Sequence, residues 1–310
     1  MSKTSTSTIN NTDLEKRLRL FLKKAKKPLI VILGPTASGK TALSLKLAHD
    51  FKGEIISTDS RQIYKEMDIG TDAILPSQQE GIPHHLLGIA KPDKTITTAE
   101  YTELALAKIK EIYKRKQVPI LVGGTGLYIS SIIFSYQIPQ VPPDEKLRAK
   151  LYKEAEKKGN EFVHAKLAKL DPEAAKGIHP NNLRYVVRAL EINLTTGKNK
   201  IDIQKKSPFN TFLIGLNWNR EKLYERVNLR VDLQLKRGLL NEVKTLLKKG
   251  YKEDSPAMSS LGVKEIIPYL KGKATLDECV EVLKKNTRNY AKRQMTWFRR
   301  YDKVHWLNMD

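Results

Sequence analysis

Short apolar runs alternate with segments of helical periodicity in the N-terminal part of the chain. Residues 28–33, 54–58 and 119–122 are continuous aliphatic or β-branched runs, which are typical of buried strands. Residues 41–51 and 101–117 place apolar side chains at helical spacing between these runs. This alternation predicts an α/β fold in which a parallel sheet is flanked by helices.

The pattern changes at Pro142. Residues 142–197 are charged, helical in period and interrupted by Asp171-Pro172 and His179-Pro180, with no convincing strand among them. A strand-like run returns at residues 212–217, and the pattern after it is helical almost to the end of the chain. We therefore predict that an all-helical segment is inserted into the α/β domain.

These patterns predict four parts of the chain. A flexible basic tail that runs into a surface helix is expected first, followed by two parts of the α/β core with the helical insertion between them. The expected boundaries are 1–27 for the tail, 28–141 for the first core part, 142–205 for the insertion and 206–310 for the second core part.

The charge of the chain indicates a polyanionic partner. Its 310 residues include 56 Lys and Arg against 34 Asp and Glu, which gives a formal net charge of +22. The single cysteine, Cys279, excludes an intramolecular disulfide and a cysteine-based zinc site, as suits a reducing cytoplasm. No apolar run approaches the roughly 18 residues of a membrane span, so we expect no membrane partner.

One motif predicts a phosphate ligand. Gly34-Pro35-Thr36-Ala37-Ser38-Gly39-Lys40-Thr41 is a complete G-x-x-x-x-G-K-T phosphate loop between a strand-like run and a helix-like segment. Its glycines let backbone N–H groups turn toward phosphate oxygens, Lys40 adds a positive charge, and the Thr41 hydroxyl can ligate Mg²⁺. We expect the loop to bind a diphosphate or a longer phosphate chain, with Mg²⁺ as cofactor.

An acidic residue stands at a position suited to chemistry. Asp59 follows the run 54–58, and open α/β sheets bind their ligands at the carboxyl ends of strands. The run 119–122 ends in Gly123-Gly124-Thr125, where a motor ATPase would need a metal-binding acid. The loop therefore leaves open a phosphate-loop kinase of a nucleoside or small metabolite, with Asp59 as its acid.

The C-terminal segment favours a nucleic acid over a small metabolite. Residues 286–301 interleave Arg and Lys with Tyr, Trp and Phe, a composition that can neutralise phosphates and stack on unpaired bases. A non-catalytic RNA-binding protein is a third alternative, but it would leave Lys40, Thr41 and Asp59 without a purpose.

Four motifs occur together in an order that resembles one enzyme family. They are the phosphate loop with Pro35-Thr36-Ala37-Ser38 inside it, residues 57–71 (STDSRQIYKEMDIGT), residues 122–128 (VGGTGLY) and residues 291–300 (AKRQMTWFRR). Over roughly residues 28–307 the chain is similar to the tRNA dimethylallyltransferases, also called tRNA isopentenyltransferases. The resemblance implies a core like that of phosphate-loop kinases, with an inserted all-helical domain that contacts the anticodon arm.

The resemblance also implies a reaction. The family transfers a dimethylallyl group from dimethylallyl diphosphate to N6 of the adenosine 3′-adjacent to the anticodon, in tRNAs that read codons beginning with U. Mg²⁺ assists the departure of diphosphate. The expected partners are therefore the tRNA anticodon stem-loop and dimethylallyl diphosphate, and we expect a cytoplasmic monomer.

The family's catalytic residues match four positions of this chain. Asp59 matches the base that accepts a proton from the adenine amine. Lys40 and Arg230 match groups that stabilise charge on the leaving diphosphate, and Thr36 matches a threonine near the substrate. The expected diphosphate-binding residues are Gly34, Pro35, Thr36, Ala37, Ser38, Gly39, Lys40, Thr41, Arg226 and Arg230.

The family's tRNA-contacting positions match residues in every part of the chain after the tail. Those in the first core part and the insertion are Asp59, Ser60, Arg61, Gln62, Thr125, Arg148, Arg184, Tyr185, Val186, Val187 and Arg188. Those in the second core part are Ser259, Ser260, Leu261, Gly262, Val263, Lys264, Lys292, Arg293, Gln294, Met295, Thr296, Trp297, Phe298 and Arg299.

Overall fold

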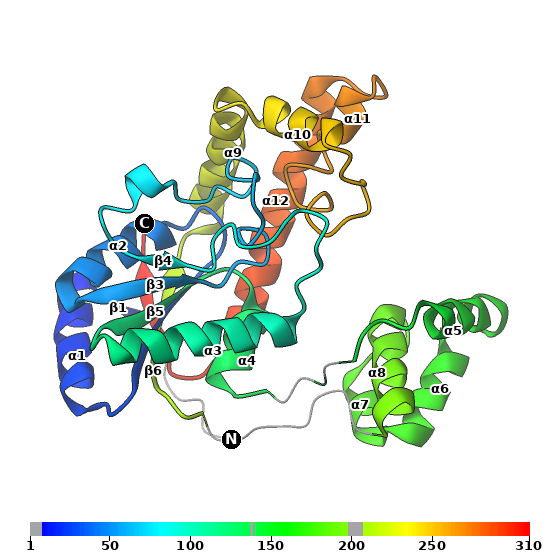
Figure 1. Cartoon of the computed structure of the whole chain (residues 1–310), viewed down its shortest axis with the longest axis horizontal. Coiled ribbons are helices and arrows are strands. Elements are labelled where there is room, and N and C mark those ends of the chain that lie inside the picture. The colour runs from blue at the N-terminus through cyan, green and yellow to red at the C-terminus, as the bar shows by residue number, and fades with distance from the viewer. Residues whose placement is uncertain (1–7, 137–138, 140, 198–206) are drawn as a thin grey trace. The chain divides into compact units, whose positions relative to one another are not determined.

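The computed structural model divides the chain into two compact units (Figure 1). The first unit comprises residues 1–133 and 208–310, and the second comprises residues 134–207. The first seven residues of the expected tail and residues 198–205 of the expected insertion lie outside the described part of the chain. The structure describes residues 8–136, 139, 141–197 and 207–310.

A seven-stranded sheet forms the centre of the first unit. Its strand order is β1-β7-β6-β2-β5-β3-β4, and all neighbouring strands are parallel. The predicted α/β architecture with a parallel sheet is therefore confirmed. The strands are β1 (Thr8–Ile9), β2 (Pro28–Leu33), β3 (Gly53–Ser57), β4 (His84–His85), β5 (Val118–Gly123), β6 (Asn210–Asn217) and β7 (His305–Asn308).

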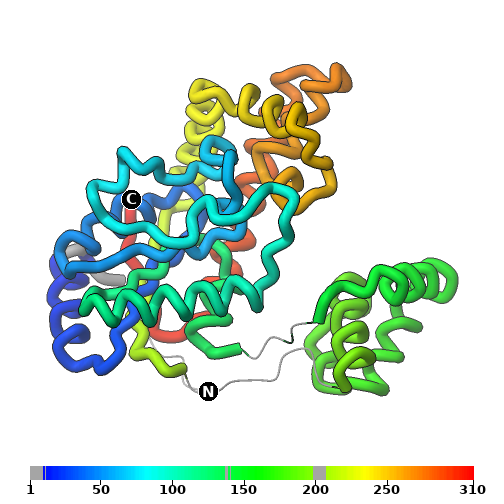
Figure 2. The backbone as a smooth tube through the Cα atoms, viewed as in Figure 1, coloured from blue at the N-terminus to red at the C-terminus, as the bar shows by residue number. Residues whose placement is uncertain are grey.

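Helices surround this sheet and extend beyond it. The tube in Figure 2 follows the chain from strand to helix to strand, with α9 to α12 beyond the sheet. The helices of the first unit are α1 (Asn11–Lys24), α2 (Lys40–Phe51), α3 (Thr98–Lys114), α4 (Gly126–Ile133), α9 (Arg220–Lys236), α10 (Leu239–Lys248), α11 (Ile267–Leu270) and α12 (Leu276–Phe298), with a 3₁₀ turn at Pro76–Gln78.

The core of the first unit explains why β2 is apolar at every interior position. Ile30 and Ile32 pack with Leu47 of α2 in one cluster of buried side chains. Leu29 and Val31 point to the opposite face, because successive side chains of a strand alternate, and they are equally buried. Both faces of the sheet are therefore covered, as expected of a parallel sheet.

Residues 8–24 form a strand and a helix, so the expectation of a flexible tail is wrong for them, while the expected helix is present as α1. Thr8–Ile9 pair with β7, and Asn10 caps α1 by accepting a hydrogen bond from the Asp13 N–H at 2.8 Å. Leu14 and Leu18 are buried in the sheet cluster. Full burial of a leucine contributes about 1.5–3 kcal/mol, so these two side chains anchor α1 to the core.

The second unit is all-helical in its described residues. Val163 and Leu167 of α6 pack against Val186, Val187 and Leu190 of α8 in a small core of its own. Most of the remaining side chains are charged and exposed, which accounts for the high polarity of this part of the sequence. Its helices are α5 (Glu145–Lys158), α6 (Asn160–Leu170), α7 (Pro172–Gly177) and α8 (Leu183–Thr196).

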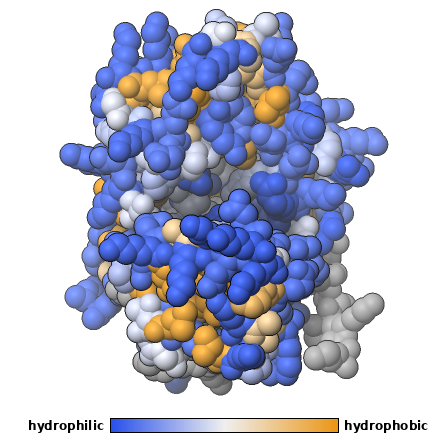
Figure 3. Space-filling view, turned by 90° about the vertical axis from the view of Figure 1, so that its right-hand side faces the viewer, coloured by the Kyte–Doolittle hydropathy of each residue, from blue (hydrophilic) through white to orange (hydrophobic). Residues whose placement is uncertain are grey.

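The described surface is polar. Hydrophilic residues dominate the face drawn in Figure 3, with apolar side chains confined to smaller patches. No helix in the described part of the chain is both long enough and apolar enough to cross a bilayer.

Candidate active site

The phosphate loop connects the end of β2 to the start of α2, at the carboxyl edge of the sheet. Gly39 has a φ of 93°, in the left-handed region that favours glycine. A Cβ on Gly34 would lie 2.9 Å from the Ser38 hydroxyl and 3.2 Å from Leu216 Cβ, so the first glycine is also required for space. The loop can therefore curl so that N–H groups at the start of α2 face an anion.

Lys40 lies inside this loop. Its ammonium group donates a hydrogen bond to the Pro35 carbonyl at 2.7 Å. Burial lowers the pKa of Lys40 to about 8 from 10.5, with a smaller lowering by the charge of Arg230 and an opposing effect of Asp59 and Asp72. An anion bound in the loop would stabilise this charge, so the site favours a phosphate ligand.

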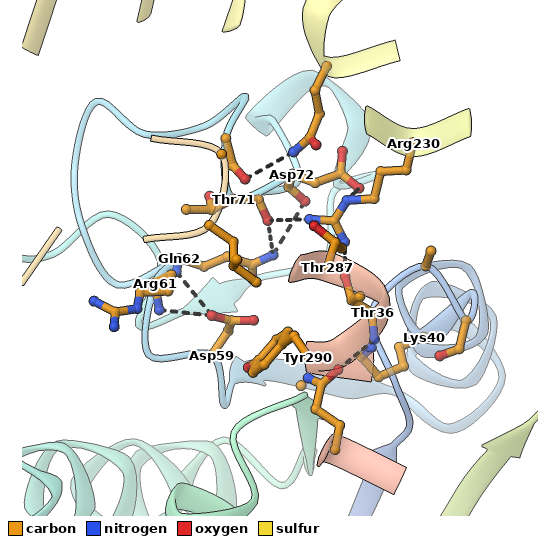
Figure 4. A pocket seen from close by; sticks show the side chains of 18 of the residues that line it. Thr36, Lys40, Asp59, Arg61, Gln62, Thr71, Asp72, Arg230, Thr287 and Tyr290 are labelled. Atoms are coloured by element: carbon orange, nitrogen blue, oxygen red, sulfur yellow. Dashed lines mark hydrogen bonds and ion pairs between the residues drawn. The ribbon is translucent and has the colours of Figure 1, made fainter. Parts of the chain in front are cut away.

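Arg230 of α9 reaches across to the phosphate loop (Figure 4). It donates a hydrogen bond to the Thr36 hydroxyl and another to the Thr71 carbonyl at 3.4 Å. Its Nε lies 3.4 Å from a carboxylate oxygen of Asp72, but has no hydrogen-bond partner among the described residues. A buried donor without a partner is costly, which indicates that Arg230 can accept an anionic ligand.

Arg226 contacts the outside of the same loop. Its Nε donates to the Ala37 carbonyl at 2.9 Å, and its guanidinium lies 4.4 Å from the ring centroid of Trp218. The Trp218 indole N–H donates to the Ser38 carbonyl at 3.0 Å. Trp218 was not predicted as a site residue, although it follows the strand-like run 212–217 directly.

Asp59 follows β3 and faces the cavity. One carboxylate oxygen accepts the N–H groups of Arg61 at 2.8 Å and Gln62 at 3.4 Å, which fixes its orientation. Tyr290 of α12 lies beside it in Figure 4. Burial raises the pKa of the Tyr290 phenol, and the nearby charge of Asp59 raises it further, so the phenol stays neutral.

Lys40, Arg226, Arg230, Asp59 and Tyr290 line one cavity of about 730 Å³ in the first unit. The cavity brings the loop, the Asp59 turn, α9 and α12 together. The predicted residues that line it are Thr36, Ala37, Ser38, Gly39, Lys40, Thr41, Asp59, Ser60, Arg61, Gln62, Arg226, Arg230, Ser259, Leu261, Gly262, Lys264, Arg293 and Gln294. Lining residues that were not predicted include Thr71, Asp72, Gln234, Thr287 and Tyr290.

Several residues that are predicted to contact tRNA have buried side chains. Most of them lie on the buried faces of their helices or inside the 259–264 turn, and Gln294 also lines the cavity, so their contact with tRNA stays a prediction. The buried residues are Val186, Val187, Ser260, Val263, Gln294 and Phe298.

Two further predicted contacts are occupied by other parts of the protein. The Thr125 hydroxyl accepts the Ser60 N–H at 3.0 Å and so supports the turn that carries Asp59. Trp297 packs under Gly126, where an added Cβ would lie 2.3 Å from the indole ring, and its N–H donates to the Tyr301 hydroxyl at 3.1 Å. Its ring is therefore a packing element of α12.

The opposite face of α12 is basic and exposed. Lys292, Arg293, Thr296 and Arg299 are exposed, in accordance with a helix that buries one side and presents cations on the other. Lys292, Arg293 and Arg300 surround an open depression of about 440 Å³ next to Trp297. This face can bind phosphates of a nucleic acid.

In the second unit, a buried carboxylate organises two of the predicted arginines. Arg148 donates to both oxygens of Glu191 at 2.8 and 2.9 Å, and Arg188 donates to Glu191 and to the Val141 carbonyl, the latter at 2.9 Å. Burial alone would raise the pKa of Glu191, but the bonds from the two arginines outweigh it and hold that pKa below its usual value. Arg184 and Tyr185 are exposed on the same helix.

The residues present fit a metal ion that is held mainly by the phosphates of a bound substrate. No group of three acidic, histidine or cysteine side chains in the described ranges could hold a metal ion. The exposed Thr41 at the start of α2 offers a hydroxyl beside the loop. Mg²⁺ keeps several waters and commonly binds through substrate phosphates, so one protein hydroxyl suffices.

Comparisons with known proteins identify the family of the chain. A family model described as IPP transferase matches residues 62–301. A tRNA dimethylallyltransferase of Acetivibrio thermocellus is 49% identical over 287 residues, which cover 91% of this chain and 92% of that protein.

Solved structures of similar enzymes also match the chain. The full-length tRNA isopentenylpyrophosphate transferase of Bacillus halodurans is similar with a TM-score of 0.69 and 44% identity, over 92% of this chain and 90% of that one. A eukaryotic dimethylallyltransferase acting on tRNA is similar with a TM-score of 0.76 and 32% identity, over 91% of this chain and 74% of that one.

Proposed function

The chain belongs to the IPP transferase family, and we propose that it transfers a dimethylallyl group from dimethylallyl diphosphate to N6 of an adenosine in tRNA. The observation that carries the proposal is the shared cavity of Lys40, Arg230 and Asp59. It offers cations for a leaving diphosphate and a carboxylate for a departing proton. The names of the relatives favour this reaction over the kinase that the loop alone left open.

The diphosphate end of the cavity lowers the barrier by stabilising negative charge. As the new N–C bond forms, the bond between the allylic carbon and the diphosphate oxygen breaks, and its electron pair leaves with diphosphate. Lys40, Arg230 and the loop N–H groups would receive this charge in a site partly shielded from water. Thr36, which accepts a bond from Arg230, would keep that guanidinium directed at the phosphates.

The other end of the cavity would accept a proton. The adenine amine is a poor nucleophile because its lone pair is delocalised into the ring. Asp59 would take the N6 proton as the amine attacks, because the N–H groups of Arg61 and Gln62 bind only one of its two carboxylate oxygens. The charge of Asp59 raises the pKa of Lys40, so the proton-accepting end of the cavity lies close to its diphosphate end.

Mg²⁺ is proposed as the metal, held by Thr41 and by the diphosphate. When bound, it would neutralise charge on the phosphate oxygens. The exposed cations of α12 and the arginines of the second unit are proposed to bind the anticodon stem-loop, with the target adenosine 3′-adjacent to the anticodon and extruded into the cavity. We further propose that the enzyme acts as a cytoplasmic monomer.

A transfer assay tests the proposal. Purified protein is incubated with Mg²⁺, unmodified tRNA and dimethylallyl diphosphate labelled in the allyl group, and in parallel with γ-labelled ATP and a mixture of nucleosides. We expect label to enter tRNA only from the allyl donor. Phosphorylation of a nucleoside without label in tRNA would contradict the proposal and favour the kinase.

A further inference from the structure

Two side chains from α9 and α10 bind the backbone of the same two loop residues. Gln234 donates from its amide to the carbonyls of Ile69 at 2.8 Å and Gly70 at 2.9 Å. Glu242 accepts the N–H of Ile69 at 2.7 Å and the N–H of Gly70 at 2.8 Å. Every backbone donor and acceptor of these two residues is therefore bonded to a side chain some 165 positions or more along the chain.

The fit around Gly70 is tight for a side chain. A Cβ there would lie 3.1 Å from a Glu242 carboxylate oxygen and 3.4 Å from Leu239 Cδ1. Gly262 approaches from the other side, since a Cβ on it would lie 3.5 Å from the Gly70 carbonyl oxygen. Gln234 is itself buried. The peptide is thus enclosed by helix α9, helix α10 and the 259–264 turn.

The next two residues of the loop reach the active site. The Thr71 carbonyl accepts from Arg230 at 3.4 Å and from the Gln62 amide at 3.3 Å. The Asp72 carboxylate lies 3.4 Å from Arg230 and 2.9 Å from Arg237. Figure 4 shows Thr71 and Asp72 between Gln62 and Arg230. The loop 69–72 therefore contacts both Arg230, which is proposed to bind diphosphate, and Gln62, whose N–H bonds to Asp59.

We propose that Glu242, with Gln234, is a positioning residue for the reaction: it fixes the loop 69–72, and through that loop it orients Arg230 and Gln62. The inference rests on the proposed function, because that function gives Arg230 and Asp59 their roles. Glu242 does not line the large cavity, so it acts through the loop and not by touching substrate, whereas Gln234 bonds the loop and also lines the cavity.

The chemistry of the contact makes an isosteric test possible. A carboxylate has only acceptors, and it faces two N–H donors. The substitution Glu242→Gln keeps the shape but turns one end into an NH₂ group against an N–H, which leaves that backbone donor unpaired. Gln234→Leu removes the amide that donates to the two carbonyls and adds no charge to the cavity that Gln234 lines, and it serves as the second variant.

The experiment measures three quantities for each variant. They are the KM for dimethylallyl diphosphate with the kcat of transfer, the Kd of inorganic diphosphate by calorimetry, and the Kd of tRNA. Glu225→Gln is the matched control, since Glu225 is an exposed residue of α9 and the substitution removes the same charge. Circular dichroism and Tm establish that each variant is folded.

We expect Glu242→Gln and Gln234→Leu to weaken inorganic diphosphate binding and to lower kcat/KM for the allyl donor tenfold or more. The tRNA Kd should stay within about twofold of wild type, and Glu225→Gln should match wild type. Unchanged diphosphate binding in both folded variants, or an equal loss of diphosphate and tRNA affinity, would overturn the positioning role. If the variants bind diphosphate more weakly as expected but the wild type transfers no dimethylallyl group to tRNA, the proposed function is refuted and the positioning role is not.

Discussion

The side chain of Gln294 joins the C-terminal helix to the phosphate loop by accepting the Thr36 N–H at 2.8 Å. Its amide nitrogen donates to the Gly124 carbonyl at 3.0 Å, so one buried side chain spans both glycine-rich turns. Gln294 precedes the exposed Arg299 on the same helix by little more than one turn. The helix whose exposed face carries cations is therefore bonded directly to the phosphate loop.

Replacing Gln294 by leucine should impair diphosphate binding. The variant keeps the volume but leaves the Thr36 N–H and the Gly124 carbonyl unpaired, and each unpaired buried group costs about 1–3 kcal/mol. We expect a lower Tm and a KM for dimethylallyl diphosphate at least tenfold higher, measured by steady-state transfer. A KM equal to that of wild type would show that the bond to Thr36 has no effect on the loop.

Lys40 should make the unliganded protein less stable at neutral pH. Burial lowers the folded-state pKa of Lys40 to about 8, so between pH 8 and 10.5 the unfolded chain binds more protons than the folded one. The cost of its charge is fully present below pH 8 and fades as the pH rises toward 10.5. Lys40→Met should therefore raise the free energy of unfolding by about 1–3 kcal/mol at pH 7, while abolishing transfer.

Urea denaturation of both proteins at pH 7 and pH 10 measures this difference. The advantage of Lys40→Met should shrink at the higher pH. A variant less stable than wild type at pH 7 would show that packing and the bond to Pro35 outweigh the cost of the buried charge.

Asp59→Asn should separate chemistry from binding. The amide oxygen can still accept the N–H groups of Arg61 and Gln62, so the turn is preserved, but an amide cannot take a proton from adenine. We expect kcat to fall at least a hundredfold, on the order that general bases supply, with the tRNA Kd within about twofold of wild type. Wild-type turnover would exclude Asp59 as the base.

Gly123→Ala should damage the site through the backbone. A Cβ on Gly123 would lie 2.4 Å from the Thr58 hydroxyl and 2.6 Å from the Thr58 carbonyl carbon, next to Asp59. The turn must shift, and we expect both Tm and transfer rate to fall. Gly177→Ala is the control, because a Cβ there meets nothing within 4 Å. Equal behaviour of the two variants would contradict the close approach.

The sequence predicted the sheet where apolar runs are long enough to carry a signal. The runs 28–33, 54–58 and 119–122 correspond to β2, β3 and β5. The strands β1, β4 and β7 have two to four residues, which are too few to show the alternation of apolar and polar side chains that marks a strand. They form because a neighbouring strand offers a free edge. The anchoring of α1 to the core was not predicted, because its burial depends on a sheet formed by later residues.

The site shows the same division between local and distant information. The phosphate loop and Asp59 follow from local motifs, and both line the cavity. Trp218, Gln234 and Glu242 were missed because their roles are contacts with loops some 165–180 residues earlier in the chain. Tyr290 lay within the basic aromatic segment, but composition alone does not say which aromatic faces Asp59.

The most direct test is transfer of labelled dimethylallyl groups to two anticodon stem-loops in the presence of Mg²⁺. One has adenosine at the position 3′-adjacent to the anticodon, and the other has guanosine there with the neighbouring adenosines kept. The account predicts labelling of the first stem-loop and none of the second. Equal labelling of both would contradict the proposed target, and labelling of neither would contradict transfer to the anticodon loop itself.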